Sequence, residues 1–216
     1  MNKILLISSG LEAIKDFVGR PPETLRMVFI PTAGNPDKDV WWIDKDRDVL
    51  TRMGFLYTEL DLASTPTERL TESLNDVDLI YIAGGYTYYL LEQIRNTGFD
   101  TVLAKFMERG GLYVGASAGA LIAGPDIEPC SSLDDPKYGP SLTSTKGIGL
   151  IDIVPMPHYD MSERSSAIEA IIAKYKDAYK VVPITDDEAI LYDGTDWHKV
   201  PSKRSELEHA WFEKAH

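Results

Sequence analysis

The pattern Gly115-Ala116-Ser117-Ala118-Gly119 constrains the fold more than any other part of the sequence. The apolar run Leu112-Tyr113-Val114 precedes it, and small apolar residues follow it as far as Ala123. Gly-x-Ser-x-Gly between a buried strand and a helix is typical of a sharp turn that exposes a serine hydroxyl at the edge of a sheet. The two glycines are needed because a Cβ atom at either position would collide with the neighbouring strand or helix. The pattern therefore predicts a strand, a tight turn and a helix.

Ser117 has two interpretations at this stage. It could be a nucleophile, because free N–H groups and the positive end of a helix dipole beneath it would stabilise a developing oxyanion. It could also simply cap the helix, because five-residue motifs of this kind recur by chance.

Apolar strand candidates alternate with helix candidates through the first half of the chain. Near-continuous apolar strands separated by helices predict a mostly parallel central sheet with helices on both faces. In such sheets, ligands bind at the carboxyl ends of the strands, where the glycine-bearing loops fall. The expected strands lie within residues 1–10, 27–34, 55–62, 78–85 and 112–114, and the expected helices over 44–53, 88–95 and 100–109. Residues 125–148, rich in Pro, Ser, Asp and Gly, read as a long functional or hairpin-like loop.

Composition limits the classes of partner. A chain of 216 residues suits a single domain over 1–216. The net charge of −12 argues against nucleic acid, which requires a basic face. The first apolar run is too short to span a membrane, and a lone cysteine, Cys130, excludes an intramolecular disulfide and favours the reducing cytoplasm. No metal-ligand spacing or nucleotide-binding motif is present, so we expect no metal and no cofactor. The oligomeric state stays open, a homodimer included.

A serine nucleophile needs a base, and His158 is the best placed of the four histidines. It follows the apolar, proline-closed run 151–157, which predicts a position at the end of a strand beside the site. His209 and His216 lie in a polar tail, and His198 lies in a predicted hairpin, so we expect all three to be ordinary surface groups.

Several motifs together resemble the peptidase E family, which includes aspartyl dipeptidases and the related cyanophycinases. The resemblance covers roughly residues 1–195. Its motifs occur in the family's order and are Ile30-Pro31-Thr32-Ala33, Gly84-Gly85-Tyr86-Thr87, Gly115-Ala116-Ser117-Ala118-Gly119, Gly147-Ile148-Gly149-Leu150, Pro157-His158-Tyr159-Asp160 and residues 183–190.

The resemblance implies a fold similar to class I glutamine amidotransferases, with serine in place of the cysteine nucleophile. Ser117 would attack the peptide carbonyl, and His158 would take its proton and pass it to the leaving amine. Two backbone N–H groups, those of Gly85 and Ala118, would form the oxyanion hole. The family often has Gly-Gly-Asn-Thr where this chain has Tyr86, a change that removes an asparagine side chain but keeps the backbone donor.

The resemblance leaves the third catalytic residue open. Aspartyl dipeptidases carry an aspartate shortly after the serine, which points to Asp134, with Asp135 behind it. The cyanophycinase-like branch instead uses a carboxylate in a later strand, where Asp186 stands. The cluster that contains Asp186 could also be a solvated turn.

Arg164 is the candidate for substrate recognition. In aspartyl dipeptidases, an arginine at the start of the corresponding helix binds the substrate's aspartate side chain, and a guanidinium fork suits a carboxylate. We expect a helix from Ser165 to Tyr175, capped by Ser162. Arg164 could instead pair with Glu163 or Asp160.

Three functions follow from these expectations. The first is a serine exopeptidase of the aspartyl dipeptidase type, acting on small peptides. The second is a family member of other specificity, such as a cyanophycinase-like or isopeptide-cleaving enzyme. The third is a non-catalytic, small-molecule-binding member of the fold in which Ser117 is structural.

Overall fold

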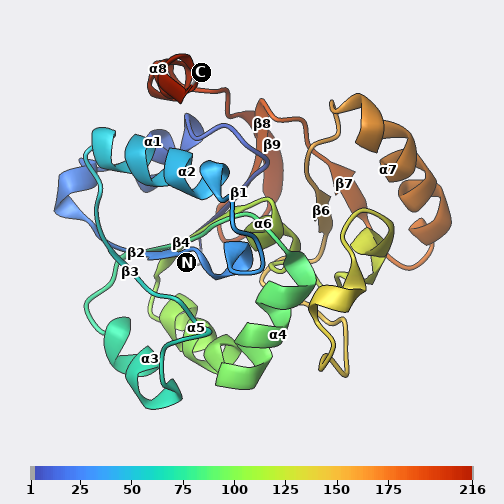
Figure 1. The fold of residues 1–216 in the computed structure, drawn as a ribbon, viewed down its shortest axis with the longest axis horizontal. Helices are drawn as coiled ribbons and strands as arrows, with labels where there is room; N and C mark the ends of the chain where they lie inside the picture. The colour runs from blue at the N-terminus through green and yellow to red at the C-terminus, as the bar shows by residue number, and fades with distance from the viewer. Residues whose placement is uncertain (1–2, 216) are drawn as a thin grey trace.

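A seven-stranded, mostly parallel sheet forms the centre of the protein (Figure 1). The structure, a computed structural model, describes residues 3–215. The strand order is β3-β2-β4-β5-β1-β8-β9; the first five strands run parallel to one another, β8 runs antiparallel to β1, and β9 runs antiparallel to β8. The strands are β1 (Lys3–Ile7), β2 (Arg26–Ile30), β3 (Leu56–Glu59), β4 (Leu79–Ile82), β5 (Leu112–Ala116), β8 (Glu188–Tyr192) and β9 (Trp197–Pro201). The prediction of a mostly parallel α/β sheet is confirmed.

Helices cover both faces of this sheet (Figure 1). Two of them, α1 and α2, lie on one face, and α3, α4 and α5 lie on the other. A short parallel pair, β6 with β7, stands beside the main sheet and carries α7. The bounds of these elements are α1 (Ala13–Val18), α2 (Trp41–Arg52), α3 (Thr67–Ser73), α4 (Thr87–Thr97), α5 (Phe99–Glu108), α6 (Ala118–Leu121), α7 (Ser162–Tyr175), α8 (Glu206–Ala215), β6 (Val154–Met156) and β7 (Val181–Pro183).

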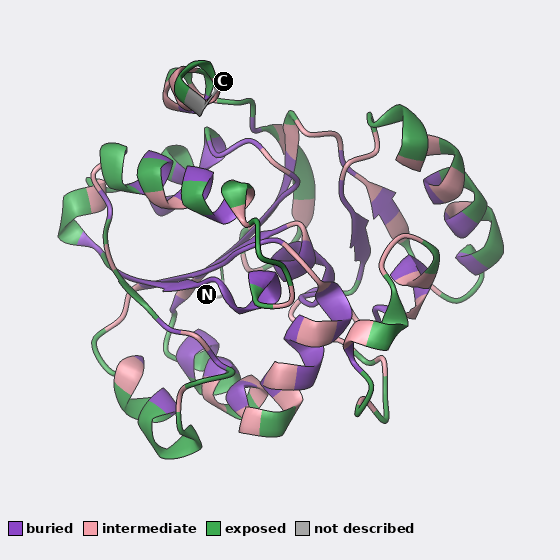
Figure 2. Ribbon diagram, in the orientation of Figure 1, coloured by how far each residue is buried: buried purple, intermediate pink, exposed green. Residues whose placement is uncertain are grey.

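The strand sequences explain the two covered faces. Successive side chains of a strand point to opposite faces, so a strand buried on both sides must be apolar at every position. In β1, Ile4 and Leu6 pack into the core on one face, and Leu5 and Ile7 pack into the core on the other. Figure 2 shows the central strands buried along their length, with exposed residues on the outer surfaces of the helices.

The loop over residues 125–148 has little regular structure, as predicted. It contains two short 3₁₀ helices, η3 (Glu128–Ser132) and η4 (Pro136–Tyr138), and lies next to α4 and α7 (Figure 1). Asp126 and Lys146 form an isolated bridge that closes it at the base. The loop therefore covers the end of the sheet where β5 enters its turn.

Two local expectations need correction. Ser162 does not cap α7, because Met161 occupies the capping position in an extended conformation and Ser162 is the first helical residue. The apolar run 151–157 contributes only three residues to a strand, Val154–Met156, since it pairs with an equally short partner. Among the described residues, none of the helices is long and apolar enough to cross a membrane.

Candidate active site

The predicted turn at Ser117 is present. β5 ends at Ala116, Ser117 has a positive φ of 48°, and α6 begins at Ala118. The two glycines are required as predicted: a Cβ atom on Gly115 would lie 2.3 Å from the carbonyl oxygen of Gly119, and one on Gly119 would lie 2.3 Å from that of Ile82. The strand and helix can therefore approach only because both positions lack side chains.

Ser117 and His158 are joined by a hydrogen bond. The Oγ atom of Ser117 lies 3.0 Å from Nε2 of His158. His158 lies just after β6. Its neighbour Tyr159 donates its N–H to the carbonyl oxygen of Ile184, the residue after β7, at 3.1 Å. His158 also has a positive φ, 65°, and these two residues are the non-glycine residues of the described chain with that backbone conformation. Such strain persists only where the surroundings impose it, and it concentrates at functional sites.

Asp186 completes the chain of contacts. Its Oδ1 lies 2.7 Å from Nδ1 of His158, on the ring edge opposite Ser117. Asp186 lies just before β8, which runs antiparallel, so the start of this strand reaches the same edge as the carboxyl ends of the parallel strands. Burial alone would raise the pKa of Asp186, but its hydrogen bond to His158 and the nearby positive charges outweigh burial and lower that pKa.

Ser8 is a site residue that the sequence analysis missed. It follows β1, and its hydroxyl donates to Oδ1 of Asp186 at 2.7 Å and accepts the backbone N–H of His158 at 2.8 Å. The hydroxyl thus positions both the carboxylate and the backbone of the histidine. The signal available in the sequence was the position of Ser8 at the carboxyl end of a buried strand, where ligands of parallel sheets bind.

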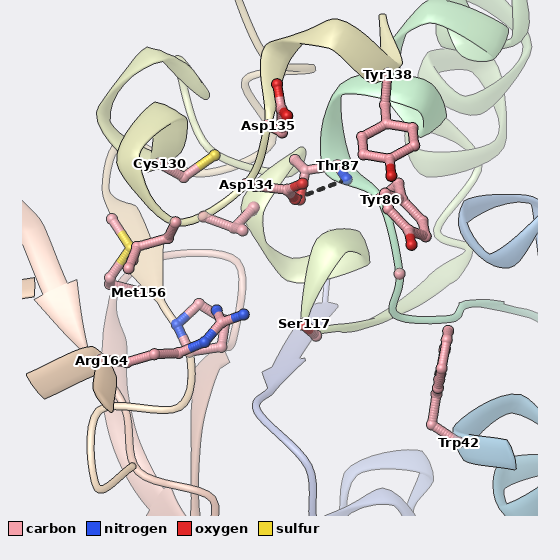
Figure 3. A pocket seen from close by; sticks show the side chains of 14 residues that line it. Trp42, Tyr86, Thr87, Ser117, Cys130, Asp134, Asp135, Tyr138, Met156 and Arg164 are labelled. Atoms are coloured by element: carbon pink, nitrogen blue, oxygen red, sulfur yellow. Dashed lines mark hydrogen bonds between the residues drawn. The ribbon is translucent and has the colours of Figure 1, made fainter. Parts of the chain in front are cut away.

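Asp134 and Asp135 do not contact His158. Oδ2 of Asp134 accepts the backbone N–H of Thr87 at 2.8 Å, which satisfies the first donor of α4 (Figure 3). Asp135 is exposed and pairs with Lys137 at 2.8 Å. Of the carboxylates that the sequence left open, Asp186 is the one brought to the imidazole. The hydrogen bond to Thr87 holds Asp134 beside α4, in the cavity that His158 does not line.

The loop after β4 lies against Ser117. A Cβ atom on Gly84 would be 3.0 Å from Cβ of Ser117, so a side chain at this position would crowd the serine. Gly85 has a φ of 145°, and the indole N–H of Trp42 donates to the carbonyl oxygen of Gly84 at 3.1 Å. Since the C=O and N–H of a trans peptide point in opposite directions, this bond fixes the direction of the Gly85 N–H. Within residues 3–215, no acceptor engages the N–H of Gly85 or of Ala118.

One electrostatic expectation is weaker than predicted. α6 has only four residues, so it lacks the aligned peptides that build a full helix dipole. Any stabilisation of an oxyanion beside Ser117 must come chiefly from individual N–H groups.

Two cavities meet at Ser117. The first, of about 340 Å³, is lined by residues that include Tyr86, Asp134, Tyr138 and Arg164 (Figure 3). The second, of about 390 Å³, is lined by His158, Asp186 and Arg204 among others. Ser117, Gly85, Trp42 and Arg164 line both cavities.

Arg164 points its guanidinium into the first cavity, as Figure 3 shows. It lies in the first turn of α7 and is half-buried. In the described part of the chain, no carboxylate lies within ion-pair distance of it, Glu163 and Asp160 included. Asp160 instead accepts the backbone N–H of Asp186 at 2.8 Å. Arg164 is therefore available to an anionic ligand.

The remaining nucleophile and histidine candidates lie elsewhere. Burial raises the pKa of the Cys130 thiol well above its usual value, so Cys130 is a poor nucleophile although it lines the first cavity. His198 on β9 and His209 on α8 are exposed. His216 lies outside the described residues.

Comparison with known proteins identifies the family of the chain. The sequence model of peptidase family S51 matches residues 4–200, so the chain belongs to this family of peptidases. An uncharacterized peptidase of Listeria innocua is 34% identical over 165 residues, 76% of this chain and 79% of that protein. A peptidase E of Salmonella arizonae is 33% identical over 132 residues, which cover 61% of this chain and 54% of that protein.

A solved structure shows the same fold. A Listeria monocytogenes protein assigned to peptidase E superposes with a TM-score of 0.86 at 28% identity. The superposition covers 93% of this chain and 98% of that one. The resemblance to the peptidase E family is thereby confirmed.

Proposed function

We propose that the protein is a serine peptidase that cleaves short peptides after an N-terminal aspartate through an acyl-enzyme. The observation that carries the proposal is the hydrogen-bonded chain from Ser117 through His158 to Asp186. The two strained backbones fall on the serine and the histidine, the groups whose positions the chemistry must fix.

The geometry supports a specific division of roles. His158 takes the proton of Ser117 as Oγ attacks the scissile carbonyl, and a tetrahedral oxyanion forms. His158 then gives that proton to the leaving nitrogen as the C–N bond breaks. Water attacks the resulting ester in a second cycle, which frees the acyl group and restores the Ser117 hydroxyl. Asp186 holds the ring and stabilises the imidazolium, because its carboxylate touches Nδ1.

The oxyanion would be bound by the N–H groups of Gly85 and Ala118. Ala118 directly follows the nucleophile, and Gly85 lies on a loop that packs against Ser117. Two preorganised backbone donors are the usual arrangement for acyl transfer. Replacement of the family's asparagine by Tyr86 leaves this arrangement intact, since only backbone atoms are used.

Specificity for aspartate rests on Arg164. An unpaired guanidinium that points into a cavity beside the nucleophile suits the side-chain carboxylate of the acyl residue. The net charge of −12 disfavours acidic ligands in general, so a local cation is needed to bind one. Asp134 lines the same cavity and supplies a negative group on the side where a free α-ammonium can lie.

The two alternative functions differ in whether they require the catalytic residues. A cyanophycinase-like or isopeptide-cleaving enzyme would keep the same catalytic chain and change only the pocket. It is favoured by the position of Asp186, which follows the pattern of that branch. A non-catalytic binding member would have no need for a strained serine hydrogen-bonded to a histidine.

Hydrolysis assays test the proposal. The wild type should label with a serine-directed covalent probe and cleave Asp-Leu faster than Ala-Leu, Asn-Leu and β-aspartyl-arginine. Ser117→Ala should lose labelling and lower turnover on the order of 10³-fold or more. Ser73→Ala, at a half-buried position at the end of α3 that lines neither cavity, is the matched control and should behave as wild type. Near-native turnover by Ser117→Ala would rule out the proposal, and a preference for the β-aspartyl substrate would favour the second function.

A further inference from the structure

The two cavities at Ser117 differ in their relation to His158. His158 and Asp186 line the second cavity, whereas Asp134 and Tyr138 line the first. The proton that His158 takes from Ser117 must reach the leaving nitrogen, so the leaving residue must lie on the imidazole's side of the serine. This step rests on the proposed function. The position of His158 therefore assigns the first cavity to the acyl residue of the substrate and the second cavity to the residue after the scissile bond.

The second cavity holds one cation whose charge is already neutralised. Lys45 is buried and contacts Asp46 at 3.0 Å and Glu208 at 3.2 Å. Burial opposes its charge, but these two carboxylates outweigh burial and raise the pKa of Lys45. Lys45 is thus already paired with carboxylates and is not free to bind an anionic ligand.

Arg164 lines both cavities, so Arg204 is the unpaired cation of the described chain that lines the second cavity and not the first. It lines the second cavity just before α8, and within residues 3–215 no carboxylate lies within ion-pair distance of it. Its guanidinium stacks over the ring of Phe212, with Cζ 5.0 Å from the ring centroid. This stacking limits the freedom of a side chain that is otherwise exposed, so less entropy is lost when it binds an anion.

The rest of the cavity wall suits an amino-acid side chain. Trp41 and Trp42 pack edge to face, with centroids 5.9 Å apart, and both line the cavity. Trp41 is 47% exposed although its ring also packs against Trp211 and Phe212, so part of its aromatic surface remains accessible from the cavity. An apolar side chain could rest on this surface while a carboxylate on the same residue reached Arg204.

We infer that the second cavity is the leaving-residue subsite and that Arg204 binds the free α-carboxylate of that residue. The preferred substrate then has one residue after the scissile bond, because only the last residue of a peptide carries an α-carboxylate. A longer peptide would place a neutral amide against Arg204.

The test compares three substrates that share an N-terminal aspartate: Asp-Leu, Asp-Leu-amide and Asp-p-nitroanilide. The wild type should prefer Asp-Leu to its amide by about 10- to 30-fold in kcat/KM, the scale of one exposed charge-assisted hydrogen-bonded pair. Arg204→Met should lose this factor on Asp-Leu and little on the other two. Lys203→Met is the matched control, because it removes an exposed neighbouring charge that does not line the cavity. Phe212→Leu should give a smaller loss, again confined to Asp-Leu.

The outcomes separate this inference from the proposed function. If the wild type cleaves the anilide but treats Asp-Leu and its amide alike, or if Arg204→Met lowers all three substrates equally, the assignment of Arg204 is overturned while the peptidase stands. If the wild type cleaves none of the three and its serine does not label, the proposed function fails and this inference fails with it.

Discussion

The catalytic and the specificity parts of the site satisfy their polar groups in opposite ways. Ser117, His158 and Asp186 are hydrogen-bonded to one another, and Ser8 ties two of them together. Arg164 and Arg204 lie at the edges of the same cavities, and no carboxylate of the described chain pairs with either. A group that must react at a fixed position is held by its neighbours, whereas a group that must bind an incoming anion is left open for it.

The two parts also differ in the elements that carry them. Ser8, Ser117 and Asp186 lie at the ends of adjacent strands of the sheet, so hydrogen-bonded ladders fix their spacing. Arg164 lies at the start of a helix beside the sheet, and Arg204 lies in the segment before α8. Elements of this second kind can vary in length without disturbing the ladder. Substitutions in the catalytic part should therefore affect every substrate, and substitutions in the specificity part should affect only charged ones.

The largest effect should follow His158→Ala. Without the imidazole, nothing takes the Ser117 proton or protonates the leaving amine, so turnover should fall on the order of 10⁴-fold or more for every substrate. Steady-state kcat with Asp-Leu and Ala-Leu measures this. His198→Ala, on exposed β9, is the matched control and should be silent. A loss limited to Asp-Leu would place His158 among the binding residues instead.

Asp186→Asn should come next, with a loss of about 10³-fold in kcat. The amide leaves the ring without a counter-charge and can hold the wrong tautomer, while Ser8 still positions the backbone of His158. Asp134→Asn keeps a carbonyl oxygen that can accept the Thr87 N–H, so its effect should stay within about tenfold and appear mainly in KM. If Asp134→Asn lowered kcat as much as Asp186→Asn, Asp134 would also have a catalytic role.

Arg164→Ala should separate substrates by charge. It leaves the aspartate carboxylate unpaired in a partly desolvated cavity, which should cost about 2–3 kcal/mol of transition-state binding for Asp-Leu. Ala-Leu should be nearly unaffected, and Arg164→Lys should rescue only in part because it lacks the planar fork. The measurement is kcat/KM for both peptides in the three proteins. An equal loss of kcat/KM for Asp-Leu and Ala-Leu would show that Arg164 does not determine specificity for aspartate.

Ser8→Ala should have a smaller effect, about tenfold in kcat. It removes one donor to Asp186 and one acceptor for the N–H of His158, each worth about 1 kcal/mol. Because the triad contacts remain, the loss should be the same for charged and neutral substrates. Ser8→Thr retains the hydroxyl and should recover most of the activity. A loss that depends on the substrate would contradict a positioning role.

The catalytic part was more accessible from the sequence than the specificity part. The glycines around Ser117 and the proline before His158 are local signals, and they act through backbone sterics that a short stretch of sequence determines. The mostly parallel sheet followed from apolar runs that need burial on both faces. What joined Ser117 to His158, however, was the pairing of strands far apart in the chain.

The choice between Asp134 and Asp186 could not be made from spacing along the chain. It depended on β8 running antiparallel, which brings Asp186 to the catalytic edge, and no local pattern encodes strand direction. Ser8 and Trp42 were missed for a related reason, since each acts through contacts with residues more than 40 positions away. Among the described residues, Arg164 and Arg204 lack a carboxylate partner because the fold places the acidic side chains elsewhere, and the sequence alone does not show this.

The smallest predicted effect concerns acid stability. The lowered pKa of Asp186 means that the folded protein holds this proton less tightly than the unfolded chain does. The stability from the pair with His158 is therefore present above the usual aspartate pKa and is lost as the pH falls through the lower folded value. Urea unfolding of wild type and Asp186→Asn from pH 7 to pH 3 measures the loss. Other carboxylates with lowered pKa, such as Asp78 and Asp126, are common to both proteins and cancel in the difference. The gap in midpoint should shrink toward low pH, and a constant or widening gap would show that Asp186 is not held as a carboxylate by the imidazole.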